Sequence, residues 1–172
     1  MHSQVVNVLT TIVIYVIYKV MNTSTTKICS FFGHREVNLT KSEIIKLKDL
    51  IITLVKEKGF NIFLFGGFGE FDALCLKLVT ELKEEYPNIK RIYCLENEKY
   101  LKKKYKLNNF YDEVIYLPVD FDYWYTRIYY RNIEIIKHSD LIVFYAEERK
   151  DSGAYKALKF AKSIKKPFIN IY

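Results

Sequence analysis

Three glycines between an apolar run and a helical pattern are the strongest constraint in this sequence. The apolar run is Ile62–Phe65, the glycines are Gly66, Gly67 and Gly69, and the helical pattern covers residues 73–85. Glycine lets the backbone turn tightly and approach a ligand closely, and the free N–H groups of the following helix then point at that ligand. This order of elements predicts a phosphate or ribose site at the edge of an α/β sheet.

Strand-like and helix-like segments alternate along the rest of the chain. Six short apolar runs predict strands, at residues 27–32, 62–65, 91–95, 113–117, 141–145 and 168–171. Helical patterns lie between them, at residues 40–59, 73–85, 98–106, 124–138 and 153–164. This alternation predicts an α/β class, Rossmann-like three-layer α/β/α fold with a mainly parallel sheet. The loops that follow the strands should then meet at one edge of that sheet.

The first 26 residues form an apolar extension, and residues 27–172 form the predicted domain. Residues 5–18 are nearly all apolar, but this run is shorter than the roughly 20 residues that span a bilayer. It also lacks the basic leader and cleavage site of a signal peptide. Three interpretations stay open for residues 1–20: an upstream extension from a misplaced start codon, a membrane anchor or interfacial segment, or an extra packed element. A membrane is a partner only in the second case.

The net charge indicates which classes of ligand the protein favours, and the cysteines indicate the redox state of its cellular compartment. Twenty-seven Lys and Arg residues against 20 Asp and Glu residues give a net charge of +7, which favours anionic ligands: nucleotides, nucleic acid or anionic lipid. Cys29, Cys75 and Cys94 are widely spaced in apolar surroundings, and are interpreted as buried free thiols in a reducing compartment. We therefore expect a cytoplasmic protein, with no metal site and no cofactor.

The glycine loop carries its own carboxylates. It matches neither the G-x-G-x-x-G fingerprint nor a P-loop, so ATP hydrolysis is disfavoured. Glu70 and Asp72 stand in the first helical turn, where they complement the helix dipole and would repel a phosphate. We expect this loop to face a ribose or a base, with Asp72 accepting from sugar hydroxyls. The alternative is a tight turn capped by carboxylates.

Two further loops supply candidate phosphate ligands. Gly33, His34 and Arg35 follow the first strand, and an arginine at that edge suits a phosphate; the alternative is a surface arginine paired with a nearby carboxylate. Ser152 and Gly153 open the last helix with free N–H groups, a hydroxyl and no carboxylate in the first turn. This is the better phosphate seat of the two glycine-containing helix starts.

The predicted helix at 124–138 has an arginine face and an apolar face. Arg127 and Arg131 share the first, and the pattern alone indicates a solvated surface there. The core face is predicted to carry Tyr125, Ile128, Tyr129, Asn132 and Ile136. The aromatic segment at 121–125 favours packing over base stacking, and the lysines at 99–106 favour a solvated helix over a nucleic-acid contact.

Three stretches together resemble the SLOG superfamily, the Rossmann-like group that contains the cytokinin-activating Lonely Guy phosphoribohydrolases and the Smf/DprA DNA-processing proteins. They are F-F-G-H-R at 31–35, G-G-F-G-E-F-D at 66–72 and R-N-I-E-I-I-K-H-S-D at 131–140. Asp72 resembles the Asp of the Smf-type G-I-D motif, and Arg131 matches the catalytic arginine of Lonely Guy enzymes. The resemblance therefore implies that Arg131 belongs to a site.

One departure from that family concerns catalysis. The phosphoribohydrolases carry P-G-G-x-G-T-x-x-E after the H-S-D strand, whereas this chain has S-G-A-Y-K-A at 152–157. The threonine position is Ala154 and the glutamate position is Ala157. Hydrolysis of an N-glycosidic bond would then need Asp72 as a substitute carboxylate.

The function expected from the sequence is binding of a nucleotide or nucleotide-derived ligand, by a sensor or an unassigned enzyme. Arg131 and Asp72 are the candidate catalytic residues. The candidate ligand-binding residues are Gly33, His34, Arg35, Gly66, Gly67, Gly69, Glu70, Asp72, Ser152 and Gly153. The alternatives are a nucleoside 5'-monophosphate phosphoribohydrolase of Lonely Guy type and single-stranded DNA binding of Smf type. The resemblance also implies a possible homodimer; nucleic acid is the less favoured partner but stays open.

Overall fold

The computed structural model describes residues 26–97, 99, 109–117 and 123–172. The predicted N-terminal extension, the predicted helix at 98–106 apart from Lys99, and the loop at 118–122 lie outside these residues. No helix among the described residues is long and apolar enough to cross a membrane.

Six parallel strands form one sheet in the described part of the chain. They are β1 (Ile28–Gly33), β2 (Ile62–Phe65), β3 (Lys90–Leu95), β4 (Glu113–Tyr116), β5 (Leu141–Tyr145) and β6 (Phe168–Asn170). Their order across the sheet is β4-β3-β2-β1-β5-β6, and every hydrogen-bonded pair is parallel. The predicted α/β class and parallel sheet are confirmed.

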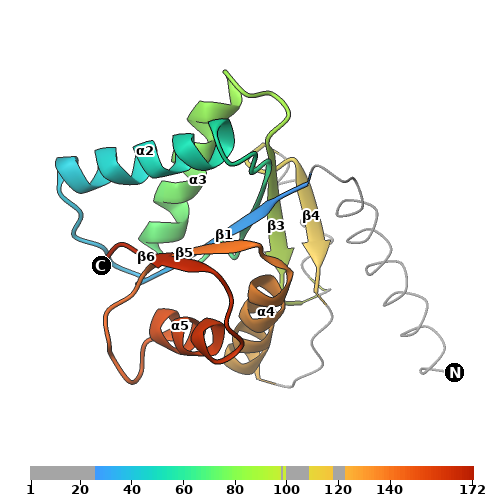
Figure 1. Ribbon diagram of the computed structural model, residues 1–172. Helices are drawn as coiled ribbons and strands as arrows, with labels where there is room; N and C mark the ends of the chain where they lie inside the picture. The colour runs from blue at the N-terminus through green and yellow to red at the C-terminus, as the bar shows by residue number, and fades with distance from the viewer. Residues whose placement is uncertain (1–25, 98, 100–108, 118–122) are drawn as a thin grey trace, which may run out of the picture.

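Within the described residues, four helices cover the two faces of this sheet (Figure 1). Helices α2 (Lys41–Lys56) and α3 (Glu70–Lys83) lie on one face, and α4 (Trp124–His138) and α5 (Gly153–Ser163) on the other. The capping box predicted at the start of α2 is present: the Thr40 hydroxyl accepts from the Glu43 N–H, and the Glu43 carboxylate accepts from the Thr40 N–H.

The core is divided by the sheet into two apolar layers. Successive side chains of β1 point to opposite faces, so Cys29 and Phe31 pack with α2 and α3 while Ile28 and Phe32 pack with α4 and α5. Cys29, Cys75 and Cys94 are buried and free, as predicted. Burial raises the pKa of the Cys94 thiol to about 12, so this thiol is protonated and unreactive at neutral pH.

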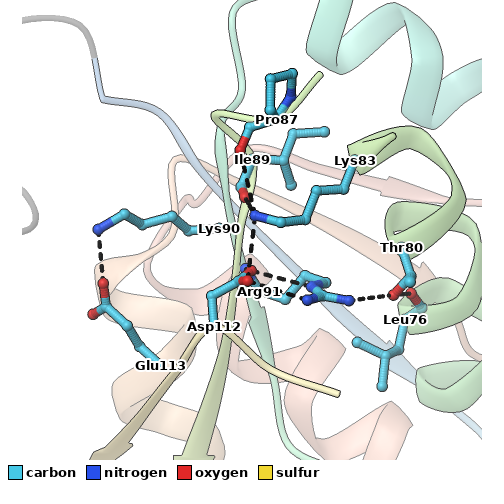
Figure 2. A network of polar contacts seen from close by, with 9 residues as sticks. All are labelled: Leu76, Thr80, Lys83, Pro87, Ile89, Lys90, Arg91, Asp112 and Glu113. Atoms are coloured by element: carbon cyan, nitrogen blue, oxygen red, sulfur yellow. Dashed lines mark hydrogen bonds and ion pairs between the residues drawn. The ribbon is translucent and has the colours of Figure 1, made fainter. Parts of the chain in front are cut away.

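A polar network fixes the amino-terminal end of β3 (Figure 2). Arg91 donates through Nε and Nη2 to the two carboxylate oxygens of Asp112 at 3.1 Å each, and through Nη1 to the Thr80 hydroxyl of α3 at 3.0 Å. Lys83 makes an ion pair with the same carboxylate at 3.2 Å. Partial burial raises the pKa of Asp112, but the bonds from Arg91 and Lys83 outweigh it and hold that pKa below its ordinary value.

The strand order reverses at β1. The chain continues to β2 on one side of β1, whereas β5 pairs on the other side. The loops that leave β1 and β5 therefore diverge and open a crevice at the carboxyl edge of the sheet, which is where open α/β sheets bind their ligands.

Candidate ligand site at the carboxyl edge of the sheet

A cavity of about 1300 Å³ lies at this reversal point. Its walls come from the loops after β1, β2 and β5 and from helices α4 and α5. Eight of the residues predicted from the sequence line it: Gly33, His34, Arg35, Gly66, Asp72, Arg131, Ser152 and Gly153. Gly67, Gly69 and Glu70 do not, and their contacts are internal.

The glycines of the loop after β2 are explained by close packing within the protein. Gly67 has φ +72° and Gly69 has φ +91°, a region that favours glycine. A Cβ at Gly67 would lie 2.3 Å from the Tyr93 ring, and one at Gly66 would lie 2.9 Å from Nη2 of Arg131. The loop is therefore shaped by its neighbours before any ligand is considered.

Asp72 closes this loop from the first turn of α3. One carboxylate oxygen accepts from the Gly66 N–H and the other from the Gly67 N–H, each at 3.1 Å. Burial raises the pKa of Asp72 to about 6, against the opposing effects of those two N–H groups and of Arg131. The carboxylate is thus a capping group of its own loop, and a role toward a sugar, through its remaining lone pairs, stays a prediction.

Glu70 holds the loop that follows β1. Its Oε2 accepts from the Val37 N–H at 2.9 Å, and its own N–H donates to the Arg35 carbonyl at 2.8 Å. These bonds fix the backbone of Arg35 beside the cavity. The Arg35 side chain is exposed and makes no hydrogen bond or ion pair with any residue that the structure describes.

Arg131 is buried, with 1% of its surface exposed, so the solvated arginine face predicted from the helical pattern is wrong at this position. Its Nη1 donates to the carbonyls of Gly66 at 2.7 Å and Cys94 at 3.0 Å, and its guanidinium carbon lies 5.4 Å from the centre of the Phe68 ring. The guanidinium thus links the carbonyl of Gly66, directly after β2, to that of Cys94 in β3.

The predicted core face of α4 is also wrong in part. Tyr125 and Tyr129 are 57% and 39% exposed, whereas Ile133 and Ile135 are buried together with Ile136. The reason is that the first two turns of α4 border the cavity, so the aromatic side chains face it instead of the core. Only the later turns pack against the sheet.

Glu96, directly after β3, was missed in the sequence. It is 8% exposed, and its Oε2 lies 3.9 Å from Nη1 of Arg131 with no hydrogen-bond partner among the described residues. Its place after a strand, on the same edge as the glycine loop, was the available signal. Glu96 and Asp72 are two buried carboxylates beside one buried arginine.

His34 connects β1 to the loop after β5. Its Nε2 accepts from the Glu147 N–H at 2.8 Å, so the neutral ring carries its proton on Nδ1, which lies 3.0 Å from the Ser152 hydroxyl. Burial lowers the pKa of His34, the Arg149 charge lowers it further, and the Glu147 charge opposes this. A neutral histidine therefore positions the residue that caps α5.

Ser152 caps the amino terminus of α5. Its hydroxyl accepts from the Tyr155 N–H at 3.3 Å, which leaves the N–H groups of Gly153 and Ala154 without a partner among the described residues. No carboxylate occupies the first turn of α5, as predicted. Arg35 and Lys156 line the cavity beside this helix start, which fits an anion.

The cavity holds more cations than anions. The cationic side chains on its wall are Arg35, Arg131, Arg149, Lys150, Lys156 and Lys159, and the acidic ones are Asp72 and Asp151. Within the described residues, no group of three His, Cys, Asp or Glu side chains could hold a metal ion. The charges on the cavity wall therefore favour an anionic ligand.

Several solved structures have a fold similar to that of this chain. No protein-family model and no curated protein matches the chain. DNA processing protein A from Helicobacter pylori, whose structure concerns single-stranded DNA binding, aligns with TM-score 0.57 and 17% identity over 84% of this chain and 64% of the other. The Streptococcus pneumoniae DprA aligns with TM-score 0.58 and 15% identity over 83% and 49%.

A third solved structure, the Moco carrier protein of Chlamydomonas reinhardtii, aligns with TM-score 0.53 and 16% identity over 83% of this chain and 74% of the other. The chain shares the fold of these proteins. This confirms the Rossmann-like fold that the sequence resemblance implied. The chain spans less than two thirds of the length of either DNA-processing protein.

Two features bear on the alternatives drawn from that resemblance. Ala157, at the glutamate position of the phosphoribohydrolases, is 4% exposed and packs in the apolar layer shared by α4 and α5. No carboxylate therefore reaches the cavity from that position. Of the lysines at 99–106 that could contact nucleic acid, only Lys99 lies in the described part of the chain.

Proposed function

We propose that this chain binds a nucleotide or nucleotide-derived anion in the cavity at the carboxyl edge of its sheet. One observation carries the proposal: the cavity joins the start of α5 to the side chain of Arg35 and the exposed ring of Phe68. In the described part of the chain, the first N–H groups of α5 and the Arg35 guanidinium have no partner. An N–H cradle with cations suits a phosphate, and an exposed aromatic ring suits a base.

The binding mode follows from where these groups lie. The phosphate sits against the N–H groups of Gly153 and Ala154, between Arg35 and Lys156. The base stacks on Phe68, whose ring is already held over the Arg131 guanidinium. The sugar then lies between them, near Gly66 and Asp72. In this arrangement the main role of Arg131 and Asp72 is to hold the backbone of the glycine loop in place through their hydrogen bonds to Gly66 and Gly67.

Hydrolysis of an N-glycosidic bond is a second candidate, and one observation favours it. Asp72 lines the cavity and has a pKa of about 6, which lies in the range useful to a general acid or base at neutral pH. Incubation with AMP, followed by chromatography for free adenine, tests it directly. Release of base that is lost in Asp72→Asn supports hydrolysis; an unchanged AMP pool leaves a binding protein.

Binding is tested by calorimetric titration with AMP, ADP-ribose and NAD on the full chain. Arg35→Glu and Lys156→Glu should each weaken binding of the best ligand by about 10-fold or more, because a charge-assisted hydrogen bond contributes roughly 1.5–3 kcal/mol. The matched control is Lys77→Glu, which makes the same charge change at an exposed site on α3, away from the cavity.

The results distinguish binding at the proposed cavity from a non-specific effect of the net charge of the protein. Equal loss of affinity in Arg35→Glu and Lys77→Glu would mean that only net charge matters, and would contradict the proposed site. Absence of binding to all three nucleotides in the unmodified protein would contradict the proposal as a whole. A ligand at 100 times its Kd should also stabilise the fold by about 2.7 kcal/mol, which a thermal-shift measurement detects.

A further inference from the structure

The cavity is longer than the site just proposed. Beyond the sheet edge it continues between α4 and α5, which lie side by side on one face of the sheet (Figure 1). We call this part the interhelical cleft. Its walls are Trp124, Tyr125 and Tyr129 from α4, and Lys156, Lys159 and Ser163 from α5.

The α4 wall of the interhelical cleft is aromatic and exposed. Trp124, Tyr125 and Tyr129 are 56%, 57% and 39% exposed, although they belong to a helix whose later turns are buried. Large aromatic side chains that remain exposed on one wall of a cavity are suited to stacking against a flat ligand. The core of the domain does not use them.

Among the described residues that line the cavity, α5 supplies two lysines and no acidic side chain. Lys156 and Lys159 follow the Ser152 cap by four and seven residues, about 6 and 10 Å along the helix axis. The Lys159 ammonium lies 5.9 Å from the centre of the Tyr155 ring, which is four residues earlier on the same helix. The acidic residues on the cavity wall, Asp72 and Asp151, both lie at the sheet edge.

The size of the cavity agrees with a second binding region. Its volume of about 1300 Å³ exceeds the ~300–1000 Å³ of most small-molecule sites. The α5 wall alone, from Ser152 to Ser163, runs for about 16 Å. A mononucleotide held at the sheet edge would leave the interhelical cleft empty.

We propose that the ligand is a dinucleotide-type molecule, whose first phosphate and base occupy the sheet edge and whose second phosphate and base occupy the interhelical cleft. This inference rests on the proposed function and names its ligand class. Lys159 binds the second phosphate, and Trp124 or Tyr129 stacks on the second base. A free dinucleotide and the end of a single strand share this chemistry.

The test compares AMP with the 5'-phosphorylated diadenylate pApA by calorimetry. The diadenylate should bind about 10-fold tighter or more, the size of one base–aromatic stack. Trp124→Ala and Lys159→Glu should each reduce pApA affinity toward that of AMP, and leave AMP affinity unchanged. Lys162→Glu is the matched control, since Lys162 is exposed on the same helix but does not line the cavity.

The results distinguish this inference from the proposed function. Equal affinities for AMP and pApA, or equal effects of Lys159→Glu and Lys162→Glu, would overturn the inference and leave the sheet-edge site intact. Binding of neither compound would overturn both. A single-stranded 20-mer that binds as tightly as pApA or tighter, with a steep salt dependence, supports the inference with a strand end as the source.

A second copy of the chain is the competing occupant of the aromatic wall. Sedimentation of the unmodified protein and of Trp124→Ala tests this occupant. A dimer that dissociates in Trp124→Ala while pApA affinity stays the same would assign the wall to self-association and overturn the inference.

Discussion

Replacing Arg131 with alanine should destabilise the fold strongly, although the chain is rich in arginine and lysine. Arg131 is 1% exposed and its Nη1 bonds two backbone carbonyls, those of Gly66 and Cys94. A hydrogen bond to a charged group contributes roughly 1.5–3 kcal/mol. Removing one member of a buried charge pair costs about 3–5 kcal/mol, and here it would leave Glu96 without its counter-charge 3.9 Å away.

These contributions overlap, so we expect a loss of about 3–5 kcal/mol in the free energy of unfolding. That is a large part of the roughly 5–15 kcal/mol that stabilises a domain. Urea denaturation followed by circular dichroism measures it. Arg131→Lys keeps the charge but loses the two-carbonyl geometry, so it should fall between the native protein and Arg131→Ala; this variant keeps the test usable if alanine prevents folding.

The control is Lys137→Ala on the same helix. Lys137 is exposed and pairs with Glu134 at 2.7 Å, and exposed pairs contribute about 0–1 kcal/mol. A loss below about 1 kcal/mol for Arg131→Ala, or one no larger than that for Lys137→Ala, would refute the view that Arg131 holds the glycine loop.

Three further predictions follow from local geometry. The folded state lowers the pKa of His34, so neutral His34 should contribute fully to the free energy of unfolding above its unfolded pKa of ~6.5, and this contribution should decline as pH falls below that value. Urea denaturation between pH 7.5 and 5 should show this decline in the free energy of unfolding, and the decline should be smaller in His34→Gln. Gly59 and Gly67 have matched φ angles of +73° and +72°, but only Gly67 faces a ring, that of Tyr93. Gly67→Ala should therefore lower the free energy of unfolding by about 1–3 kcal/mol more than Gly59→Ala does. Equal losses would contradict the claim that contact with the Tyr93 ring requires glycine at position 67. Asp112→Ala should lower stability by about 1–3 kcal/mol at pH 7, with the difference from the native protein shrinking as acid protonates the carboxylate; a pH-independent difference would show that its ionic partners do not matter.

Most of the fold was predictable because its elements have clear boundaries. The strands at 62–65 and 141–145 and the helix at 124–138 have the predicted bounds. Continuous apolar runs bounded by glycine or polar residues mark buried parallel strands. Helix α3 begins at Glu70, which confirms that Glu70 and Asp72 stand in its first turn, although the clear helical pattern of the sequence starts only at residue 73.

The site was less predictable, because its contacts depend on sheet order. His34 and Ser152 are 118 residues apart and meet only because β1 and β5 are neighbours. An arginine in a helical pattern is normally predicted to be exposed to solvent. The pattern contains no information on the strands, so it does not predict that Arg131 donates to the carbonyls of Gly66 and Cys94. The family resemblance, not the pattern, pointed to Arg131. Glu96 had no motif at all.

The most direct test of the central claim is an amide NMR titration of the full chain with AMP. Binding at the carboxyl edge predicts that the N–H resonances of Gly153 and Ala154 shift most, together with the side-chain signals of Arg35, and that these shifts saturate with one Kd. Saturable shifts confined to residues away from the cavity, on α2 or α3, or no shift at millimolar AMP, would contradict the claim that this cavity binds a nucleotide phosphate.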